Sequence, residues 1–389
     1  MKMKYVILRD TPGKRYGIPT AGTVSPSVSP KVEVGELEPR RAAGLARKKG
    51  IRGVAPVIPM KLIAPVGIDT DAVPAADGVT WGVQAVGADT SPFTGEGIAV
   101  AVLDTGIDMS HPAFTGVDIV RKNFTTGSDD DEDGHGTHCA GTIFGRNVDG
   151  TRIGVAPGIH KALVGKVLGK DGGSSDQIMQ AIEWAVNGGA NVISMSLGID
   201  FPGCVKELEA ADFPTELATS MALEAYRVNV LLFESLASFI GEKSKIMQAT
   251  LLVAAAGNES RREESPDFEI AVGPPAVARG FVSVAAVAKT PQGFAVAPFS
   301  NVGARVSGPG VGVISAKRGG GLKLDSGTSM ATPHVAGVAA LWAQKLSMTG
   351  ELNSKLLADR LVGIATTAGM KPGFDPYDIG AGLVQSPQG

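Results

Sequence analysis

The stretch Ile98-Ala99-Val100-Ala101-Val102-Leu103, followed at once by Asp104-Thr105-Gly106, decides the fold class. Six apolar residues without polar alternation predict a strand buried on both faces, as in a parallel sheet covered by helices. Similar apolar runs, with helical stretches between them, lie at residues 162–168, 191–197, 251–256 and 281–287. This alternation predicts an α/β fold with a doubly wound parallel sheet, whose functional groups gather at the carboxyl ends of the strands.

Composition narrows the class of protein. Of 389 residues, 43% are hydrophobic and 19% charged, which is typical of a folded protein, and the net charge of −3 argues against a nucleic-acid partner bound by bulk positive charge. The apolar run at residues 5–8 is stopped by Arg9 and Asp10, too early for a signal peptide, and no run reaches the roughly 18 residues of a membrane helix. We therefore expect no membrane partner and a cytoplasmic location, with secretion by another route left open. Two cysteines, Cys139 and Cys204, are too few for a disulfide framework.

The charge is divided unevenly along the chain. Residues 1–75 hold 13 lysines and arginines against 6 acidic residues, a net +7, whereas residues 76–389 hold 23 against 33, a net −10. Strand-like residues 4–8 and 54–63 and a helical stretch at 39–49 predict a small α+β unit ahead of the α/β domain. We place the boundary at residues 75/76, after a linker rich in proline and glycine.

A second departure from a minimal α/β pattern is a helical insertion near residues 200–249. Apolar residues recur there at helical spacing, among them Leu217, Met221, Val228, Leu232 and Leu236. Packing on the domain surface is the simple interpretation, and contact with a partner or control of substrate access is the alternative.

Three segments carry residues suited to nucleophilic catalysis. Asp104 ends the first core strand, His135 lies between Gly134 and Gly136, and Ser329 follows Gly327-Thr328 ahead of an apolar helical run. Each alone is a weak signal, since a strand-end aspartate or a serine at a helix start more often caps a turn or a helix. Together they supply what acyl transfer needs: an acid that orients a histidine, a histidine that takes a proton, and a hydroxyl that attacks a carbonyl carbon.

Their order along the chain discriminates between hydrolase folds. The order Asp104, His135, Ser329 is that of subtilisin, whereas α/β-hydrolases run Ser, acid, His and chymotrypsin-like enzymes run His, Asp, Ser. The serine also lacks a nucleophile elbow, because Gly327-Thr328-Ser329-Met330-Ala331 ends in alanine. A lipase or esterase is thereby disfavoured.

From residue 81 to residue 383 the chain resembles the subtilisin-like serine peptidases. Five motifs carry the resemblance, in order: Val102-Leu103-Asp104-Thr105-Gly106-Ile107, His135-Gly136-Thr137-His138-Cys139-Ala140-Gly141, Ser194-Met195-Ser196-Leu197-Gly198, Ala254-Ala255-Ala256-Gly257-Asn258 and Gly327-Thr328-Ser329-Met330-Ala331-Thr332-Pro333-His334. The resemblance implies a catalytic triad of Asp104, His135 and Ser329. It also implies that Asn258 donates to the oxyanion, a role that suits a side-chain amide at a strand end.

The same resemblance implies where a polypeptide substrate binds. An extended substrate would lie as an extra strand between two segments, with a largely apolar pocket for the residue before the scissile bond. One segment is Gly172, Gly173 and Ser174, the other is Ser196, Leu197 and Gly198, and the pocket is lined by Ala255, Ala256 and Gly257.

No metal is expected in the chemistry. His135-x-x-His138 lacks the spacing and the internal glutamate of a zinc-protease helix, and no other cofactor is required. A solvated loop is the preferred interpretation of the acidic run 129–133, and structural calcium bound by its carboxylates is the alternative. In the loop after the histidine helix, Val148 stands where many subtilisins have an asparagine ligand for calcium, which puts that site in doubt.

Residues 1–75 resemble, more loosely, the family's propeptide, an α+β inhibitor and folding chaperone that leaves its tail in the active site. The opposite charges of the two units fit such docking, and processing is expected within residues 64–77. The prediction is a serine endopeptidase made as a self-inhibited zymogen. Two alternatives stay open: a peptide cyclase or ligase on the same scaffold, and a catalytically idle, self-inhibited peptide-binding protein.

Overall fold

The computed structural model describes residues 2–12, 28–67, 78–243 and 248–389. An eight-stranded sheet forms its centre, with the strand order β13-β12-β11-β9-β5-β7-β6 and β14 paired to β12. All neighbours are parallel except β13. The strands are β5 (Ala99–Asp104), β6 (Asp118–Asn123), β7 (Lys161–Lys166), β9 (Val192–Met195), β11 (Leu251–Ala255), β12 (Phe281–Thr290), β13 (Gly293–Val296) and β14 (Val306–Pro309). The predicted doubly wound α/β fold is confirmed.

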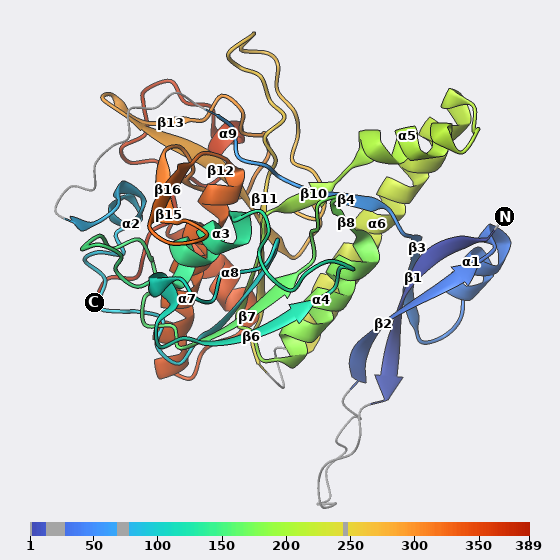
Figure 1. Ribbon diagram of the computed structural model, residues 1–389, viewed down its shortest axis with the longest axis horizontal. Coiled ribbons are helices and arrows are strands. Elements are labelled where there is room, and N and C mark those ends of the chain that lie inside the picture. Colours follow the sequence, from blue (N-terminus) through green and yellow to red (C-terminus); the bar gives the residue numbers. More distant parts are fainter. Residues whose placement is uncertain (1, 13–27, 68–77, 244–247) are drawn as a thin grey trace, which may run out of the picture.

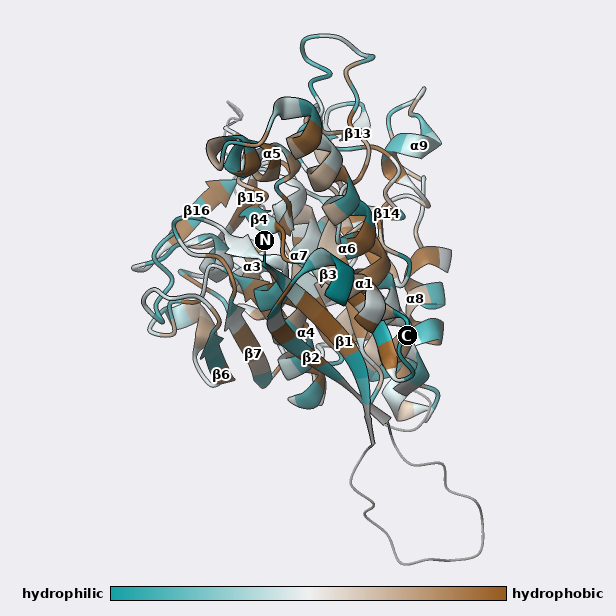
Figure 2. Ribbon diagram, turned by 90° about the vertical axis from the view of Figure 1, so that its right-hand side faces the viewer, coloured by the Kyte–Doolittle hydropathy of each residue, from teal (hydrophilic) through white to brown (hydrophobic). Residues whose placement is uncertain are grey.

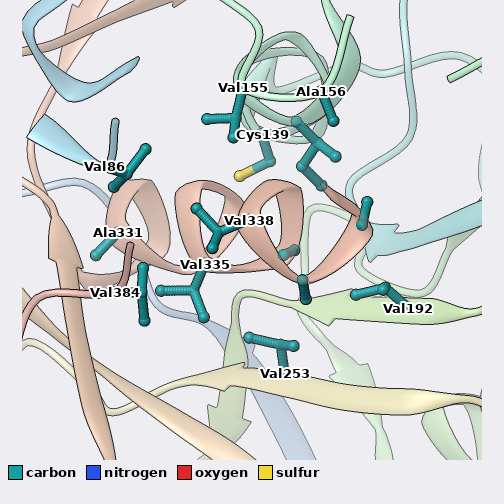
Figure 3. Close-up of a cluster of buried hydrophobic side chains, with 14 of the residues drawn as sticks. Val86, Cys139, Val155, Ala156, Val192, Val253, Ala331, Val335, Val338 and Val384 are labelled. Atoms are coloured by element: carbon teal, nitrogen blue, oxygen red, sulfur yellow. The ribbon is translucent and has the colours of Figure 1, made fainter. Parts of the chain in front are cut away.

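The apolar run that predicted the central strand packs on both faces, as expected. Val100 and Val102 of β5 belong to one buried cluster, while Ala99, Ala101 and Leu103 belong to another on the opposite face. The first cluster packs under α3 (His135–Phe144) and α7 (Thr328–Met348), and the second under α4 (Ser175–Asn187) and α6 (Thr215–Lys243). Figure 3 shows valines of α7 facing valines of β9 and β11.

The remaining elements surround this three-layer core. They are α2 (Trp81–Ala85), a 3₁₀ turn at Pro112–Phe114, β15 (Val313–Ala316) paired with β16 (Leu322–Asp325), α8 (Ser354–Gly363) and α9 (Pro376–Ile379). None of the described helices is long and apolar enough to cross a membrane.

The predicted insertion forms a helical hairpin. Helix α5 (Phe201–Ala210) packs against the 29-residue α6, which runs diagonally across the molecule (Figure 1). Buried Leu232, Phe233 and Leu236 of α6 join the core cluster beneath it. Helix α6 packs on the domain surface, as the simple interpretation predicts. The N-terminal unit packs against the same helix.

The N-terminal unit is a separate three-stranded antiparallel sheet with one helix. Its order is β2-β1-β3, formed by β1 (Met3–Pro12), β2 (Val28–Leu37) and β3 (Ile51–Pro56), with α1 (Pro39–Ala46) between β2 and β3. Figures 1 and 2 show this unit lying against α6, and Figure 2 shows apolar stretches along β1. The proposed domain boundary at 75/76 falls outside the described residues and stays a prediction.

The two units meet through apolar packing, hydrogen bonds and ion pairs. A Cβ at Gly53 would lie 2.7 Å from Leu232 Cδ1, so α6 packs directly on the backbone of β3. The amide of Asn229 donates to the Pro56 carbonyl at 2.8 Å, and Lys4 Nζ lies 2.5 Å from Asp176 Oδ2. Because Lys4 is half-exposed, we assign more of the docking free energy to the packing than to the ion pair.

The single strand predicted at residues 54–63 is wrong. The chain forms β3 in the N-terminal sheet and then β4 (Pro59–Leu62). Strand β4 belongs to a different sheet, in which it lies between β10 (Leu197–Ile199) and β8 (Gly173–Ser174). Buried Ile58 separates them: its amide and carbonyl bond the Ser175 hydroxyl (3.2 Å) and amide (3.0 Å). The break between β3 and β4 therefore follows from the hydrogen bonds of Ile58 to the first residue of α4. Local strand propensity does not predict such a tertiary contact.

Candidate active site

The candidate site lies at the carboxyl ends of three adjacent strands. Asp104 is the last residue of β5, Ser196 follows β9, and Asn258 comes three residues after β11. Neighbouring parallel strands end at the same edge of the sheet, so this geometry follows from the fold. His135 and Ser329 come from the first turns of α3 and α7, and both helices begin at this same edge of the sheet.

Asp104 and His135 form a direct contact within the protein. His135 Nδ1 lies 2.8 Å from Asp104 Oδ1, and both side chains are 1% exposed. Glycine makes the approach possible: Gly134 precedes α3 with φ of 100°, and a Cβ on Gly136 would lie 2.2 Å from the Gly106 carbonyl oxygen. The other ring nitrogen, Nε2, is buried and has no hydrogen-bond partner in the described part of the chain.

The surroundings of His135 stabilise its protonated form. Burial alone would lower the pKa of His135, but the adjacent Asp104 carboxylate outweighs burial and raises the pKa well above 6.5. His138 and His334, each fully buried without such a close carboxylate contact, have pKa values lowered to about 4 by burial. His138 Nε2 instead contacts the Val313 carbonyl, consistent with a packing residue.

These shifts predict an order of titration. In full-length Ser329→Ala protein, imidazole NMR should show His135 titrating above pH 6.5 and His138 and His334 staying neutral until about pH 4. The raised pKa of His135 stabilises the fold below pH 6.5, and that contribution is lost as pH rises through its folded pKa. The lowered pKa values of the other two destabilise the fold as pH falls from about 6.5 to 4. Asp104→Asn should lower the His135 pKa, and an unchanged value would contradict this account.

Ser329 and Asn258 do not bond His135 or each other; both reach the chain's own backbone. The Ser329 hydroxyl donates to the Ile63 carbonyl at 2.6 Å, and the Asn258 amide nitrogen donates to the next carbonyl, that of Ala64, at 2.9 Å. The Asn258 oxygen accepts from the amide and the hydroxyl of Thr328, at 2.9 and 2.7 Å, which ties it to the start of α7. Two candidate catalytic groups thus donate hydrogen bonds to the carbonyls of two consecutive residues.

The backbone on either side of those carbonyls lies in the predicted substrate slot. Strand β4 pairs antiparallel with β10 (Leu197–Ile199) on one edge and β8 (Gly173–Ser174) on the other. Beyond β4, the Ile63 amide donates to the Ser196 carbonyl at 3.2 Å and the Val66 amide to the Ser326 carbonyl at 2.7 Å. A Cβ at Gly172 would lie 2.6 Å from the Met60 carbonyl oxygen, which explains why a small residue stands there.

The predicted pocket residues lie beside this slot. Ala255 and Ala256 are buried at the end of β11, each 1% exposed. Gly257 has φ of 116°, and a Cβ there would lie 2.2 Å from Asn301 Nδ2. Their contact with a substrate side chain stays a prediction.

Cys139 lies between the candidate catalytic groups. Its Sγ is 3.7 Å from His135 Nδ1 and 3.5 Å from the Ser329 carbonyl oxygen, and burial raises the pKa of the thiol. The thiol is therefore protonated at neutral pH and fills space between α3 and α7. Cys139 and Cys204 are both buried and unpaired.

The acidic run at residues 129–133 is anchored rather than uniformly solvated. Asp131 is only 2% exposed, and its carboxylate accepts from Thr105 Oγ1 (2.8 Å), from the Gly134 amide (2.8 Å) and from both the amide and hydroxyl of Thr137 (2.9 and 2.6 Å). Burial raises its pKa, but these hydrogen bonds outweigh burial and lower it. The sequence alone gave no reason to select Asp131, which joins the loop after Asp104 to the helix that begins at His135.

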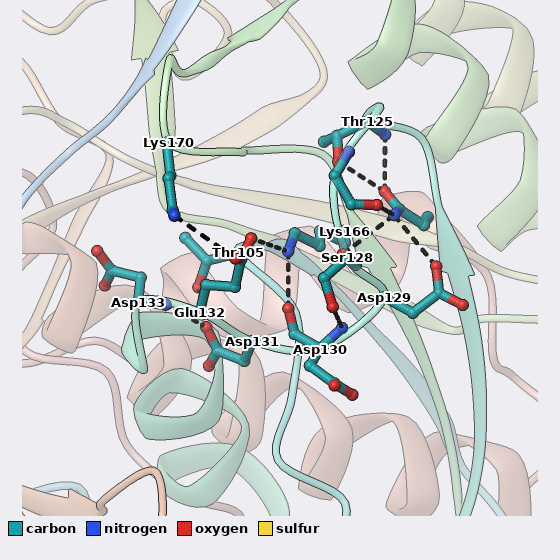
Figure 4. Close-up of polar contacts among 12 residues, drawn as sticks. Thr105, Thr125, Ser128, Asp129, Asp130, Asp131, Glu132, Asp133, Lys166 and Lys170 are labelled. Atoms are coloured by element: carbon teal, nitrogen blue, oxygen red, sulfur yellow. Dashed lines mark hydrogen bonds and ion pairs between the residues drawn. The ribbon is translucent and has the colours of Figure 1, made fainter.

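The other carboxylates of the run have protein partners. Asp130 pairs with Arg121. Glu132 pairs with Lys166, whose nearly buried ammonium also donates to the Asp130 carbonyl at 2.7 Å (Figure 4). Asp129 accepts from the Asn123 amide nitrogen. Since calcium needs six to eight converging oxygens, a run already occupied by these donors does not fit a calcium site.

Comparison with known proteins assigns the family. Residues 95–372 match the model described as the subtilase family. The chain belongs to the subtilase family. M-protease of Shouchella clausii is 37% identical over 71% of this subtilase, and Subtilisin BL of Lederbergia lenta is 38% identical over 69%. The alignments span 63% of the length of M-protease and 86% of Subtilisin BL.

The fold of this subtilase also has a solved relative that includes the N-terminal region. The crystal structure of fervidolysin from Fervidobacterium pennivorans, a keratinolytic enzyme related to subtilisin, aligns with a TM-score of 0.67 at 23% identity. The alignment covers 99% of this chain and 60% of the other. It supports the architecture of the subtilase.

Proposed function

We propose that this subtilase is a serine endopeptidase that cleaves peptide bonds through an acyl-enzyme on Ser329 and is made in a self-inhibited form. One observation carries the proposal: strand β4 of the chain itself lies between β8 and β10, and the carbonyl oxygen of Ile63, the next residue, lies 2.6 Å from the Ser329 hydroxyl. Backbone pairing of this kind is how an extended polypeptide substrate is held.

The groups at the site have distinct roles in this chemistry. Above its raised pKa His135 is neutral, and its buried Nε2, which has no hydrogen-bond partner among the described residues, takes the Ser329 proton as the oxygen attacks the carbonyl carbon. Asp104 keeps Nδ1 protonated and stabilises the imidazolium. Asn258 Nδ2 and the Ser329 amide stabilise the oxyanion, His135 then protonates the leaving amine, and water repeats the sequence to release the acid.

In the uncleaved chain the Ser329 hydroxyl and the Asn258 amide are not arranged for attack on the Ile63 carbonyl carbon. The Ser329 hydroxyl donates to the Ile63 oxygen rather than to His135, and Asn258 bonds the carbonyl of Ala64 instead of that of Ile63. For cleavage the serine hydroxyl must turn to His135, and the Ile63 carbonyl must move to Asn258. Slow self-processing follows from this arrangement.

The register predicts the bond that is processed. The serine hydroxyl lies at the carbonyl of Ile63, and Lys61 pairs with Gly198 two residues earlier, so Ile63–Ala64 is the bond presented. Purified wild-type protein should yield a fragment that begins at Ala64, identified by intact mass and N-terminal sequencing. A major product beginning between residues 68 and 77 would contradict this register.

Mass spectrometry with a supplied peptide distinguishes the endopeptidase from the other functions that the scaffold allows. Hydrolysis of a supplied peptide gives products whose summed mass exceeds that of the substrate by one water, whereas cyclisation gives one product lighter by one water than the linear acid. A protein that never reacts with a fluorophosphonate, even after limited proteolysis, would be an idle peptide-binding protein.

A further inference from the structure

The loop after α3 does not have the form of a cation-binding loop. Val148 and Thr151 bond each other's backbone at 2.9 and 2.8 Å, which closes a two-residue turn at Asp149 and Gly150, with φ of 49° and 78°. The Val148 side chain is buried and carries no oxygen, and its carbonyl already accepts from Thr151. The position at which many subtilisins have a calcium ligand is therefore used to make a tight turn.

A guanidinium occupies the neighbouring carbonyl oxygens. Arg152 Nη2 donates to the Ala88 carbonyl at 2.9 Å and to the Val155 carbonyl at 3.3 Å, and Nε donates to the Gly154 carbonyl at 3.3 Å. These oxygens come from two segments far apart in the sequence, and none belongs to a carboxylate. Partial burial lowers the pKa of Arg152, a guanidinium that nevertheless stays charged.

The backbone of Arg152 joins the same two segments. Its amide donates to the Gly78 carbonyl at 2.6 Å, and its carbonyl accepts from the Thr80 amide at 3.1 Å. Three residues later, the Val155 amide donates to the Thr142 carbonyl at 3.0 Å, so the loop is also attached to α3. Arg152 thus connects residues 78–88 to the helix that carries His135.

Converging carbonyl oxygens repel one another unless a cation lies between them. Calcium would require several further oxygens, usually including carboxylates, whereas a guanidinium brings a permanent charge and five donors on a rigid plane. The oxygens around Arg152 are already engaged by it, so they do not fit a calcium ion.

We propose that the Arg152 guanidinium performs, within the protein, the role that resemblance to subtilisins assigns to calcium at this loop. The loop is then held closed by a covalently attached cation, and its stability does not depend on calcium. This inference concerns stability and does not rest on the proposed catalysis.

The test uses the full chain with Ser329→Ala, which prevents self-cleavage. Thermal unfolding should show that Arg152→Ala lowers Tm by about 3–6 °C, because three carbonyls lose a charged donor. Arg152→Lys, which keeps the charge, should lose less. Arg227→Ala is the matched control, since that arginine is exposed and pairs with Glu224 within one helix, and it should change Tm by less than about 1 °C.

A second measurement locates the effect and needs no new variant. Hydrogen exchange of peptides covering residues 145–156 should be equal in about 5 mM CaCl₂ and in about 5 mM EDTA. This calcium concentration is a saturating excess for a site of ordinary affinity, and EDTA removes the ion. Protection of these peptides by calcium would overturn the proposal. It would equally be overturned if Arg152→Ala lowered Tm no more than Arg227→Ala.

Discussion

Replacing Ser329 by alanine should abolish both fluorophosphonate labelling and self-cleavage, and leave the chain at its full mass of 39.8 kDa. In the proposed mechanism the serine supplies the attacking oxygen, and loss of the corresponding serine in subtilisin lowers kcat by about 10⁶-fold. The fold should survive, because the hydroxyl contributes a single hydrogen bond, to the Ile63 carbonyl. Intact mass and activity toward an added peptide, after the N-terminal unit has been removed by limited proteolysis, measure both effects.

Ser347→Ala is the matched control for this experiment. Ser347 lies on the same helix, α7, but is exposed near its end, so its loss should leave labelling and processing unchanged. If purified Ser329→Ala protein were still processed in the presence of serine-protease inhibitors, another nucleophile would have to be sought.

Replacing Asn258 by alanine should lower kcat by about 10²–10³-fold with a much smaller change in KM. That loss is the one known for removing a single oxyanion-hole donor in subtilisin. In the proposed mechanism the amide donates to charge that develops only in the transition state, so substrate binding in the ground state would gain little from it. Steady-state kinetics of the processed protein measure the two constants separately.

Asn258→Asp distinguishes donation from a structural role. The aspartate keeps an oxygen that can accept from Thr328 and so preserves the start of α7, but it removes the donor. The kcat of this variant should fall at least as far as that of the alanine variant while its Tm stays near that of the parent. Near-normal kcat in Asn258→Asp would contradict the oxyanion role, and the exposed Asn187→Ala on α4 provides the neutral comparison.

Much of the fold was predictable because the central strands carry an unambiguous pattern. Residues 98–103 are apolar throughout, and the structure shows why: alternate residues of β5 face two different buried clusters. The position of Asp104 at the end of that strand followed directly. Its contact with His135 was expected from the motifs, although the catalytic roles of both residues stay predictions.

The relation between β3 and β4 was not predictable in the same way. Residues 54–63 have continuous strand propensity, and what divides them is tertiary: Ile58 is fixed to Ser175, 117 residues later. Pro56 and Pro59 were the local signals of a break. Likewise, the hydrogen bond from Thr105 to Asp131 and the one from Arg152 to the Ala88 carbonyl join residues 26 and 64 positions apart, which only folding brings together.

The short span between β3 and β4 has a consequence for how the proposed inhibition would end. Two residues connect the docked sheet to the strand in the cleft, so each attachment places the other at a high effective concentration. Hydrolysis of Ile63–Ala64 would leave both attachments on the same fragment and so preserve their avidity. A second cut between the sheet and the cleft strand would turn one bivalent ligand into two weak monovalent ones, and dissociation would follow from that cut.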